Sequence, residues 1–364
     1  MVTALHVGLL GLGIINNVHR RNLLAMPGVR LTALWDPLVQ RARDVAAEVE
    51  AAAGAGCRVY EDYRELIERS GVDCLFIAIP PHRHQDHEIL AARRGIPFLV
   101  EKPIVRQLAQ ARAIEREINA SGVLHAVGYH NRYAPHCEAA LEALAEATVG
   151  TALGFTYWKY PTEASQPRWH HWLFDDAEGG GQLHEHTTHV LDLARYLVGE
   201  VRSVYCQRAR RLPHPEITNY NTADVHAVNL AFENGALGLV GAGHMTPRAY
   251  WWGLHILTDR CILDYNERRL RILEAERERE VAPELPNGLH FVQDSTFIRA
   301  VRTADRGLVR STYSDAIRST AISLAALESA AEGRPVAVEE VLARSLRALA
   351  PAPPAGTADE EARR

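Results

Sequence analysis

The first 124 residues alternate short apolar runs with helix-like segments, and this alternation constrains the fold more than any other feature. Residues 73–79 form a continuous apolar run, as expected for a strand covered on both faces of a sheet. The other predicted strands cover residues 6–10, 31–35 and 97–100, and predicted helices cover 41–53, 84–94 and 108–121. Strands that alternate with helices indicate an α/β fold with a doubly wound parallel sheet.

After about residue 123 the pattern changes. A strand-like segment at 150–160 and a helical segment at 180–197 come first. Further strand-like segments follow without helices between them, at 201–210, 223–232, 236–243, 254–258 and 262–265. Such a series predicts an α+β domain with a mostly antiparallel sheet, closed by helices at 291–303 and 313–331.

Length and composition agree with two globular domains. The chain has 364 residues, and we expect domains over 1–124 and 125–350, with a disordered, proline-rich tail over 351–364. Hydrophobic residues make up 47% and charged residues 23%, with a formal net charge of -5. Both signs of charge are interspersed without a long basic run, so nothing favours nucleic acid or an anionic membrane as a partner.

The sequence also indicates where the protein works. No apolar stretch is long enough to span a bilayer. The N-terminus lacks the basic region of a signal peptide. Five scattered cysteines form no Cys-x-x-Cys pair, which suits a reducing, cytoplasmic location.

A glycine turn follows the first predicted strand and opens a helix. Gly11 permits a tight turn, and Gly13 lets backbone amides approach a pyrophosphate, which a helix starting at Ile14 and Ile15 would stabilise. Asn16 replaces the third glycine of the dinucleotide-binding fingerprint, so a turn and helix cap without a ligand is the alternative interpretation.

An acidic residue ends the second predicted strand. Asp36 stands about twenty residues beyond the glycine turn, where a carboxylate can bind ribose hydroxyls. It would repel a 2′-phosphate, so the sequence favours NAD over NADP, although Gln40 and Arg41 lie close enough to soften that preference. These features predict a Rossmann domain that binds NAD.

The tripeptide Glu101-Lys102-Pro103 follows the predicted strand at 97–100. Open α/β sheets bind ligands beyond the carboxyl ends of their strands. Lys102 is therefore placed to move a proton while a nicotinamide moves a hydride. The alternative interpretation is a solvated lysine on a loop.

The helical segment at 180–197 supplies a second candidate group. Glu185 and His189 are four residues apart and would share one face of a continuous helix. A neutral His189, or Lys102 with a lowered pKa, could take the proton of a hydroxyl that is being oxidised. Glu185 would hold a neighbouring hydroxyl of the substrate or orient His189; a solvated or structural polar face is the alternative.

The histidines of this segment raise the question of a metal. His184 and His186 diverge on a helix, and His186 and His189 have no clear third ligand nearby in the sequence. We therefore expect no metal site, with His186 at the substrate pocket. Aromatic side chains just before the segment suit a sugar ring, although core packing explains each of them singly; the candidates are Trp158, Trp169 and His170.

These motifs, in this order, resemble the glucose-fructose oxidoreductase / inositol dehydrogenase / rhizopine-catabolism (Gfo/Idh/MocA) family over nearly the full chain. The resemblance includes the glycine turn with His19, the segment 77–84 with Ile79, Pro80 and His84, and the Glu101-Lys102-Pro103 motif. It continues with 128–133 and with the glycine run and helix at 179–192. Glu185 stands where the family has aspartate, and Thr187 where it has glycine.

The resemblance implies roles for further residues. Ile79, Pro80, His84 and Glu101 would join the cofactor site. Tyr129, Asn131 and Arg132 would join the substrate site, since they begin the second domain. The family fold is a Rossmann domain with a second α+β domain built on a large open sheet, and the resemblance favours a cis bond before Pro103.

The sequence thus predicts an NAD-dependent oxidoreductase that acts on a hydroxyl or ketone of a sugar, cyclitol or related polyol. Two alternatives stay open: a hydrolase or lyase that uses tightly bound NAD for transient oxidation, and a non-enzymatic NAD-binding regulator. Because one face of the second domain's sheet would lack covering helices, we expect a homodimer or homotetramer that pairs through it.

Overall fold

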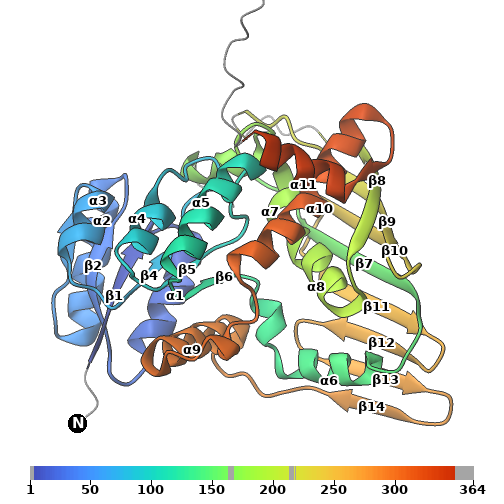
Figure 1. The fold of residues 1–364 in the computed structure, drawn as a ribbon, viewed down its shortest axis with the longest axis horizontal. Coiled ribbons are helices and arrows are strands. Elements are labelled where there is room, and N and C mark those ends of the chain that lie inside the picture. The colour runs from blue at the N-terminus through green and yellow to red at the C-terminus, as the bar shows by residue number, and fades with distance from the viewer. Residues whose placement is uncertain (1–3, 163–167, 213–216, 218, 349–364) are drawn as a thin grey trace, which may run out of the picture.

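The computed structural model describes residues 4–162, 168–212, 217 and 219–348 of the chain (Figure 1). The tail expected over 351–364 lies outside the described residues, as do the side chains of Arg168, Trp169 and Trp251. Two sheets organise the rest, with the first at the N-terminal end of the molecule and the second at the opposite end (Figure 1).

The first sheet is parallel and doubly wound, as predicted. Its strand order is β3-β2-β1-β4-β5-β6. The strands are β1 (Leu5–Leu10), β2 (Val29–Trp35), β3 (Arg58–Tyr60), β4 (Cys74–Ile77), β5 (Phe98–Val100) and β6 (His125–Val127). The helices are α1 (Ile14–Leu24), α2 (Val39–Ala53), α3 (Tyr63–Arg69), α4 (His87–Arg93) and α5 (Leu108–Ser121). The order reverses between β1 and β4, which makes their carboxyl ends the expected ligand-binding edge.

The sequence pattern did not predict two short strands of this sheet or one short helix of the same domain. Both β3 and β6 have three residues, too few to show periodicity, and α3 has seven. Residues Phe98 to Val100 of β5 pair in parallel with β6, so the first sheet continues past residue 124.

The second sheet has nine strands in the order β14-β13-β12-β11-β7-β10-β9-β8-β15. They are β7 (Val149–Lys159), β8 (Val201–Ala209), β9 (Val225–Phe232), β10 (Leu237–Thr246), β11 (Trp251–Thr258), β12 (Cys261–Asn266), β13 (Leu270–Glu274), β14 (Glu278–Val281) and β15 (Val336–Ala337). Only the β7–β10 pair is parallel among the described pairings, so the sheet is mostly antiparallel, as predicted.

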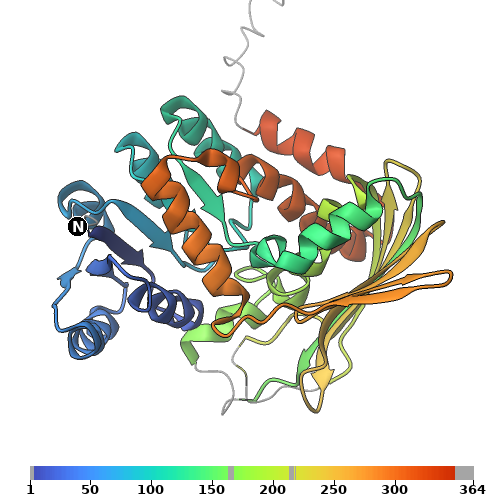
Figure 2. The same ribbon diagram turned by 90° about the horizontal axis from the view of Figure 1, so that it is seen from below.

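Helices cover one face of this sheet, and Figure 2 shows no described helix on the other face. The second part contains α6 (Pro135–Leu144), α7 (Gly181–Glu185), α8 (Thr188–Val198), α10 (Tyr313–Glu332) and α11 (Val338–Arg347), with short turns η1 (His130–Tyr133), η2 (Arg168–Phe174) and η3 (Arg306–Leu308). Along β7 the burial alternates: Ala152 is 2% exposed whereas Leu153 is 36% exposed. The alternation follows from the two-residue period of a strand with one covered face.

One long helix returns from the second part to the first. Helix α9 (Gly288–Thr303) packs against α1, and its N-terminal end contacts η1 (Figure 1). Phe297 buries its ring edge-to-face on Phe76 of β4, with ring centroids 5.6 Å apart. Aromatic pairs of this geometry stabilise beyond their buried area. Helix α9 thereby packs the C-terminal half of the chain against the first domain.

Buried ion pairs hold η1, α8 and α10 together. The Arg132 guanidinium donates to Asp192 from Nε at 2.8 Å, and both side chains are 1% exposed. Asp315 is a second acceptor, at 2.5 Å from Nη1. Such pairs cost desolvation, but removing one partner leaves a buried charge uncompensated.

We therefore expect Arg132→Met to lower the free energy of unfolding by about 3–5 kcal/mol, because Asp192 stays buried without its cation. Urea denaturation of the purified protein measures the loss. Arg271→Met, which removes an exposed pair with Glu278, is the control and should leave the free energy of unfolding nearly unchanged. Equal losses in the two variants would contradict this role of Arg132.

Candidate active site

The glycine turn fits a dinucleotide. Gly11 has φ of +77°, and a Cβ there would lie 2.4 Å from the carbonyl oxygen of Ala78, so only glycine fits. Helix α1 begins at Ile14, directly after the turn, with Gly13 as its N-cap and no side-chain cap. The first backbone N–H groups of a helix have no intrahelical partners, so those at Ile14 and Ile15 are available to a pyrophosphate.

Asp36 is tied to this turn and is 2% exposed. Its Oδ2 accepts a hydrogen bond from the Leu12 amide at 2.8 Å, and Oδ1 accepts one from the Leu38 amide at 2.8 Å. Arg41 Nη1 lies 3.2 Å from Oδ2. The carboxylate therefore stands beside the pyrophosphate turn, where ribose hydroxyls can reach its remaining lone pairs.

The loop after β4 carries Ile79 and Pro80 at the same edge of the sheet. Ile79 is 9% exposed, and its side chain lies close to Gly11. Both ring nitrogens of His84 have protein partners, the carbonyl oxygen of Ile79 at 3.1 Å and Glu88 Oε1 at 2.5 Å. His84 therefore shapes the loop, and it reaches the proposed cofactor site only through Ile79.

Lys102 lies directly beyond β5 and faces the second half of the molecule. The Lys102–Pro103 peptide bond is cis, as predicted. Lys102 Nζ donates to Glu185 Oε1 at 2.6 Å and to the Glu185 carbonyl oxygen at 2.9 Å. The two side chains are 10% and 14% exposed. Burial raises the pKa of Glu185, and the contact with Lys102 opposes the rise. Glu185 Oε2 is buried without a hydrogen-bond partner among the described residues, so it can accept a hydrogen bond from a ligand.

Glu101 is turned away from the cleft. It accepts from the Lys102 amide at 3.2 Å and from His19 Nε2 at 3.1 Å, and the opposite nitrogen of His19 lies 3.0 Å from Asp294. Burial opposes the charge on His19, but the two carboxylates prevail and raise its pKa to about 10. A Cβ on Gly128 would lie 2.4 Å from Glu101 Oε1, so Gly128 gives that carboxylate its space. Glu101 thus positions the backbone of Lys102.

The predicted continuous helix over 180–197 is wrong, because the segment is two helices. Helix α7 ends at Glu185, and α8 begins at Thr188. The amides of His186 and Thr187 both donate to the carbonyl oxygen of Gln182, which closes α7. Thr187 replaces the family's glycine at this break. Glu185 and His189 therefore reach the cleft from two helices and do not share one helical face.

His189 is kept neutral. Burial, followed by the charge of Lys102 and then by His290, lowers the pKa of His189 well below its usual value. Its Nδ1 is buried without a hydrogen-bond partner among the described residues, so the ring keeps hydrogen-bonding capacity that the protein does not use. A neutral imidazole beside a lysine and a carboxylate has the composition of a general-base site.

The aromatic side chains predicted to meet a sugar ring can be described in part. The indole of Trp158 stacks on His186, with ring centroids 4.5 Å apart, and His186 Nδ1 lies 3.4 Å from His244 Nε2. His170, in η2, lies edge-on to Trp172 at 5.4 Å, and burial followed by Lys102 lowers its pKa to about 4. The side chain of Trp169 lies outside the described residues. His170 and His186 therefore lie close enough to Lys102 to feel its charge, and Trp158 stacks on His186.

The three candidates at the start of the second domain differ in role. The hydroxyl of Tyr129 lies 3.1 Å from that of Thr188, and the donors of Arg132 are used by the buried ion pairs, so both act as scaffold. Asn131 is 2% exposed, and neither atom of its amide has a hydrogen-bond partner among the described residues. Of the three, Asn131 alone keeps free polar atoms for a ligand.

Sequence reasoning missed three histidines near this site: His130, His244 and His290. His130 lies edge-on to His189 at 4.7 Å and stacks on His290 at 3.9 Å. His290 lies about a hundred residues beyond the predicted helix, so no local spacing could have joined it to the site.

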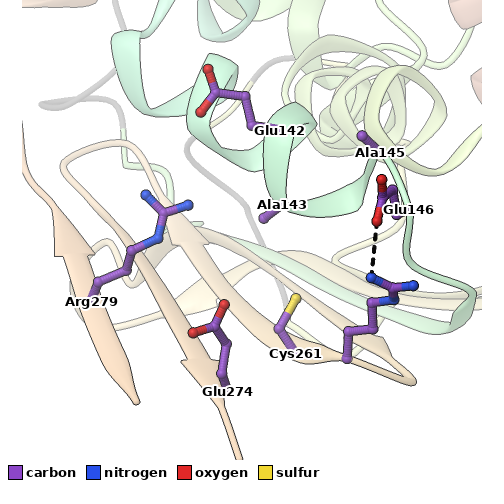
Figure 3. Close-up of a pocket in the computed structure, with 8 residues that line it drawn as sticks. Glu142, Ala143, Ala145, Glu146, Cys261, Glu274 and Arg279 are labelled. Carbon is purple, nitrogen blue, oxygen red and sulfur yellow. Dashed lines mark hydrogen bonds and ion pairs between the residues drawn. The ribbon is translucent and has the colours of Figure 1, made fainter.

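Other possible sites are remote or absent in the described part of the structure. No group of three histidine, cysteine, aspartate or glutamate side chains among the described residues could hold a metal ion. A surface pocket lies between the end of α6 and strands β12 to β14 (Figure 3). It carries Glu142, Glu146, Arg260, Cys261, Glu274 and Arg279, and none of the candidate residues lines it. None of the described helices is both long and apolar enough to cross a membrane.

Comparison with known proteins identifies relatives along the full length. The chain is 27% identical over 341 residues to scyllo-inositol 2-dehydrogenase (NAD(+)) of Bacillus subtilis, which covers 91% of this chain and 95% of that protein. It is 31% identical over 211 residues to levoglucosan dehydrogenase of Pseudarthrobacter phenanthrenivorans, with 55% and 53% covered.

Solved structures share the fold. A levoglucosan dehydrogenase in complex with NADH superimposes with a TM-score of 0.79 at 23% identity, covering 92% of this chain and 99% of that one. An oxidoreductase from Agrobacterium radiobacter in complex with NAD+, L-tartaric acid and magnesium gives 0.77 at 19% identity, covering 93% and 99%.

Two family models match in the order in which the two sheets occur. Residues 5–129 match the oxidoreductase family with an NAD-binding Rossmann fold, and residues 138–264 match the GFO/IDH/MocA C-terminal domain. The first match contains the glycine turn, Asp36 and Lys102, which are the residues that the geometry fits to NAD. Because the two models cover more than half of the chain, the protein belongs to the Gfo/Idh/MocA family of NAD-dependent oxidoreductases.

Proposed function

We propose that the protein transfers a hydride between the nicotinamide of NAD and a CH–OH group of a sugar, cyclitol or related polyol. The observation that carries this proposal is the Lys102–Glu185 pair beside a neutral His189, at the strand edge where the Rossmann domain binds NAD. The dehydrogenases of inositol and levoglucosan among the relatives support the substrate class.

NAD, when bound, supplies the hydride acceptor. Lys102 Nζ donates to Glu185, and it can donate a further hydrogen bond to the substrate oxygen. His189 Nε2 takes the proton of the hydroxyl while the C–H bond breaks and the hydride leaves for the nicotinamide. Glu185 Oε2 accepts a hydrogen bond from a neighbouring hydroxyl. Trp158 and His186 stack on each other, and an aromatic face of this kind suits the C–H face of a sugar ring.

A screen of sugars and polyols with NAD, followed by NADH absorbance, tests the reaction. Net NADH formation with at least one cyclitol or sugar supports the proposal. Cofactor that stays bound through purification, together with conversion of a glycoside and no net reduction of added NAD, would instead favour transient oxidation.

Substitution of either candidate acid–base group should slow turnover while NAD still binds. We expect Lys102→Ala and His189→Ala each to lower kcat by about 10²–10⁴-fold, the usual contribution of a general acid or base. Steady-state kinetics and NADH binding by fluorescence measure the two effects. Arg271→Ala, at an exposed ion pair, is the control. Near-normal kcat in both the Lys102 and His189 variants would refute the assignment.

Glu185 should act mainly on binding. Glu185→Gln keeps the shape of the side chain but removes the charge, so we expect KM for the substrate to rise more than kcat falls. The same steady-state assay separates the two constants. A fall in kcat as large as that of Lys102→Ala would place Glu185 in the proton path.

The acid limb of the pH profile should report His189. A base acts only when neutral, and the pKa of His189 lies below the usual value of about 6.5, so oxidation should persist at pH 6.5 and fail only at lower pH. The pH dependence of kcat/KM measures the midpoint. A midpoint at or above about pH 7 would show that another group is the base.

Cofactor preference should depend on Asp36. Its carboxylate would repel a 2′-phosphate, so we expect kcat/KM to be higher with NAD than with NADP. Asp36→Ser removes the repelling charge and should therefore narrow the ratio of kcat/KM with NAD to that with NADP. An equal or inverted ratio in the unaltered protein would contradict this expectation.

We further propose that two or four copies pair through the uncovered face of the second sheet. Leu153 of β7 and Leu239 of β10 are neighbours in register, 36% and 51% exposed, and Leu237 is 60% exposed. An exposed apolar face of this kind is usually buried in a symmetric oligomer.

Light scattering should give two or four times the chain mass of 40.4 kDa. The double variant Leu153→Glu/Leu239→Glu should shift the protein towards the monomer, because it would bury carboxylates at the interface. Leu346→Glu, at an exposed leucine of α11, is the matched control. A monomeric unaltered protein at micromolar concentration would contradict the proposal.

All five cysteines are free, which supports the proposed location in a reducing cytoplasm.

A further inference from the structure

Two of the histidines missed by sequence reasoning form a stacked pair. The rings of His130 and His290 lie 3.9 Å apart with an interplanar angle of 28°. His130 also meets the ring of His189 edge-on at 4.7 Å. The three rings of His290, His130 and His189 therefore follow one another in contact, with the proposed base at one end.

Both histidines lie close to elements of the first domain. His130 opens η1, three residues after β6, the edge strand of the parallel sheet. His290 lies in the first turn of α9, which packs against α1, and its ring is 6.4 Å from that of His19 on α1. The pair thus lies where the second domain begins, close to elements of the NAD-binding domain. The groups proposed for substrate, Glu185 and His186, come from the second domain.

The pair is neutral and has hydrogen-bonding capacity to spare. Burial, then His290, lowers the pKa of His130 well below its usual value, and burial also lowers the pKa of His290. His130 is 7% exposed, and its Nδ1 has no hydrogen-bond partner among the described residues. Among the described residues neither ring's Nε2 makes a hydrogen bond, so each can serve a ligand as donor or acceptor.

We propose that His130 and His290 form the seat of the nicotinamide carboxamide of NAD. A primary amide offers two donor hydrogens and one acceptor oxygen, and two neutral imidazoles can satisfy both kinds of group. The oxidised nicotinamide ring is positively charged, so a neutral wall avoids the repulsion that lysine, arginine or a protonated histidine would cause. Asn131, whose buried amide is also unpaired, follows His130 in the same turn and can complete the seat.

The proposal rests on NAD binding and does not depend on which substrate is oxidised. It distinguishes the two ends of the cofactor, because the glycine turn and Asp36 hold only the ADP-ribose part. ADP-ribose lacks nicotinamide and is therefore the matched probe.

The test compares two ligands on two variants. His130→Phe keeps a ring for stacking but removes both nitrogens, and His130→Asn keeps one donor and one acceptor. We expect the Kd of NADH, measured by calorimetry, to rise about tenfold in His130→Phe and less in His130→Asn. The Kd of ADP-ribose should stay unchanged in both. His136→Phe, at a buried histidine of α6 outside the cleft, should change neither.

Three results would overturn the proposal. An unchanged Kd of NADH in His130→Phe would show that the carboxamide is held elsewhere. Equal weakening of NADH and ADP-ribose would show a general effect on the Rossmann domain. A rise in substrate KM with no change in NADH binding would place His130 on the substrate instead. The first two results do not depend on the proposed polyol chemistry, so failure of one proposal leaves the other to be judged separately.

Discussion

A row of alternating charges crosses the molecule at the cleft, and the site is built around it. Asp294 of α9 and Glu101 hold His19 of α1 between them, and Glu101 in turn accepts the backbone amide of Lys102. Lys102 then reaches across to Glu185 at the end of α7. Negative and positive groups alternate from α9 to α7, so each buried charge has an opposite neighbour. This arrangement is the condition under which buried ions are tolerated.

The row explains why a glutamate precedes the lysine. Glu101 makes no contact with the cleft; its carboxylate lies against Gly128 and His19 and holds the main chain from which Lys102 projects. The acidic residue of the motif therefore acts on the position of the lysine, and the lysine acts on the ligand. A second-domain carboxylate, Glu185, then draws the ammonium into the space between the domains.

The fold followed from the sequence wherever elements were long and periodic. The parallel sheet, the cofactor turn and the series of antiparallel strands were all predicted, because apolar runs and glycine positions are local signals. Strand β6 was missed because its three residues begin with the polar His125, whereas the equally short β5 lies in a longer apolar run. The break between α7 and α8 was missed because it depends on Gln182 closing the first helix through the amides of His186 and Thr187. His290 was missed because only the return of α9 brings it to the cleft.

Environment, and not residue type, divides the histidines of this protein into two classes. His19 lies between two carboxylates and holds a proton firmly, with a pKa raised to about 10. His189 lies only a few side chains away, yet burial, followed by Lys102 and His290, lowers its pKa. The carboxylate of Glu101 lies 3.1 Å from His19 Nε2 and therefore stabilises a cation there. The consequence is a permanent cation that braces the scaffold behind Lys102, and neutral imidazoles in front of it that can exchange protons. A site for oxidising a hydroxyl beside a positively charged nicotinamide needs both kinds, because a second mobile cation in the cleft would oppose the cofactor, while a neutral His19 would leave two buried carboxylates facing each other.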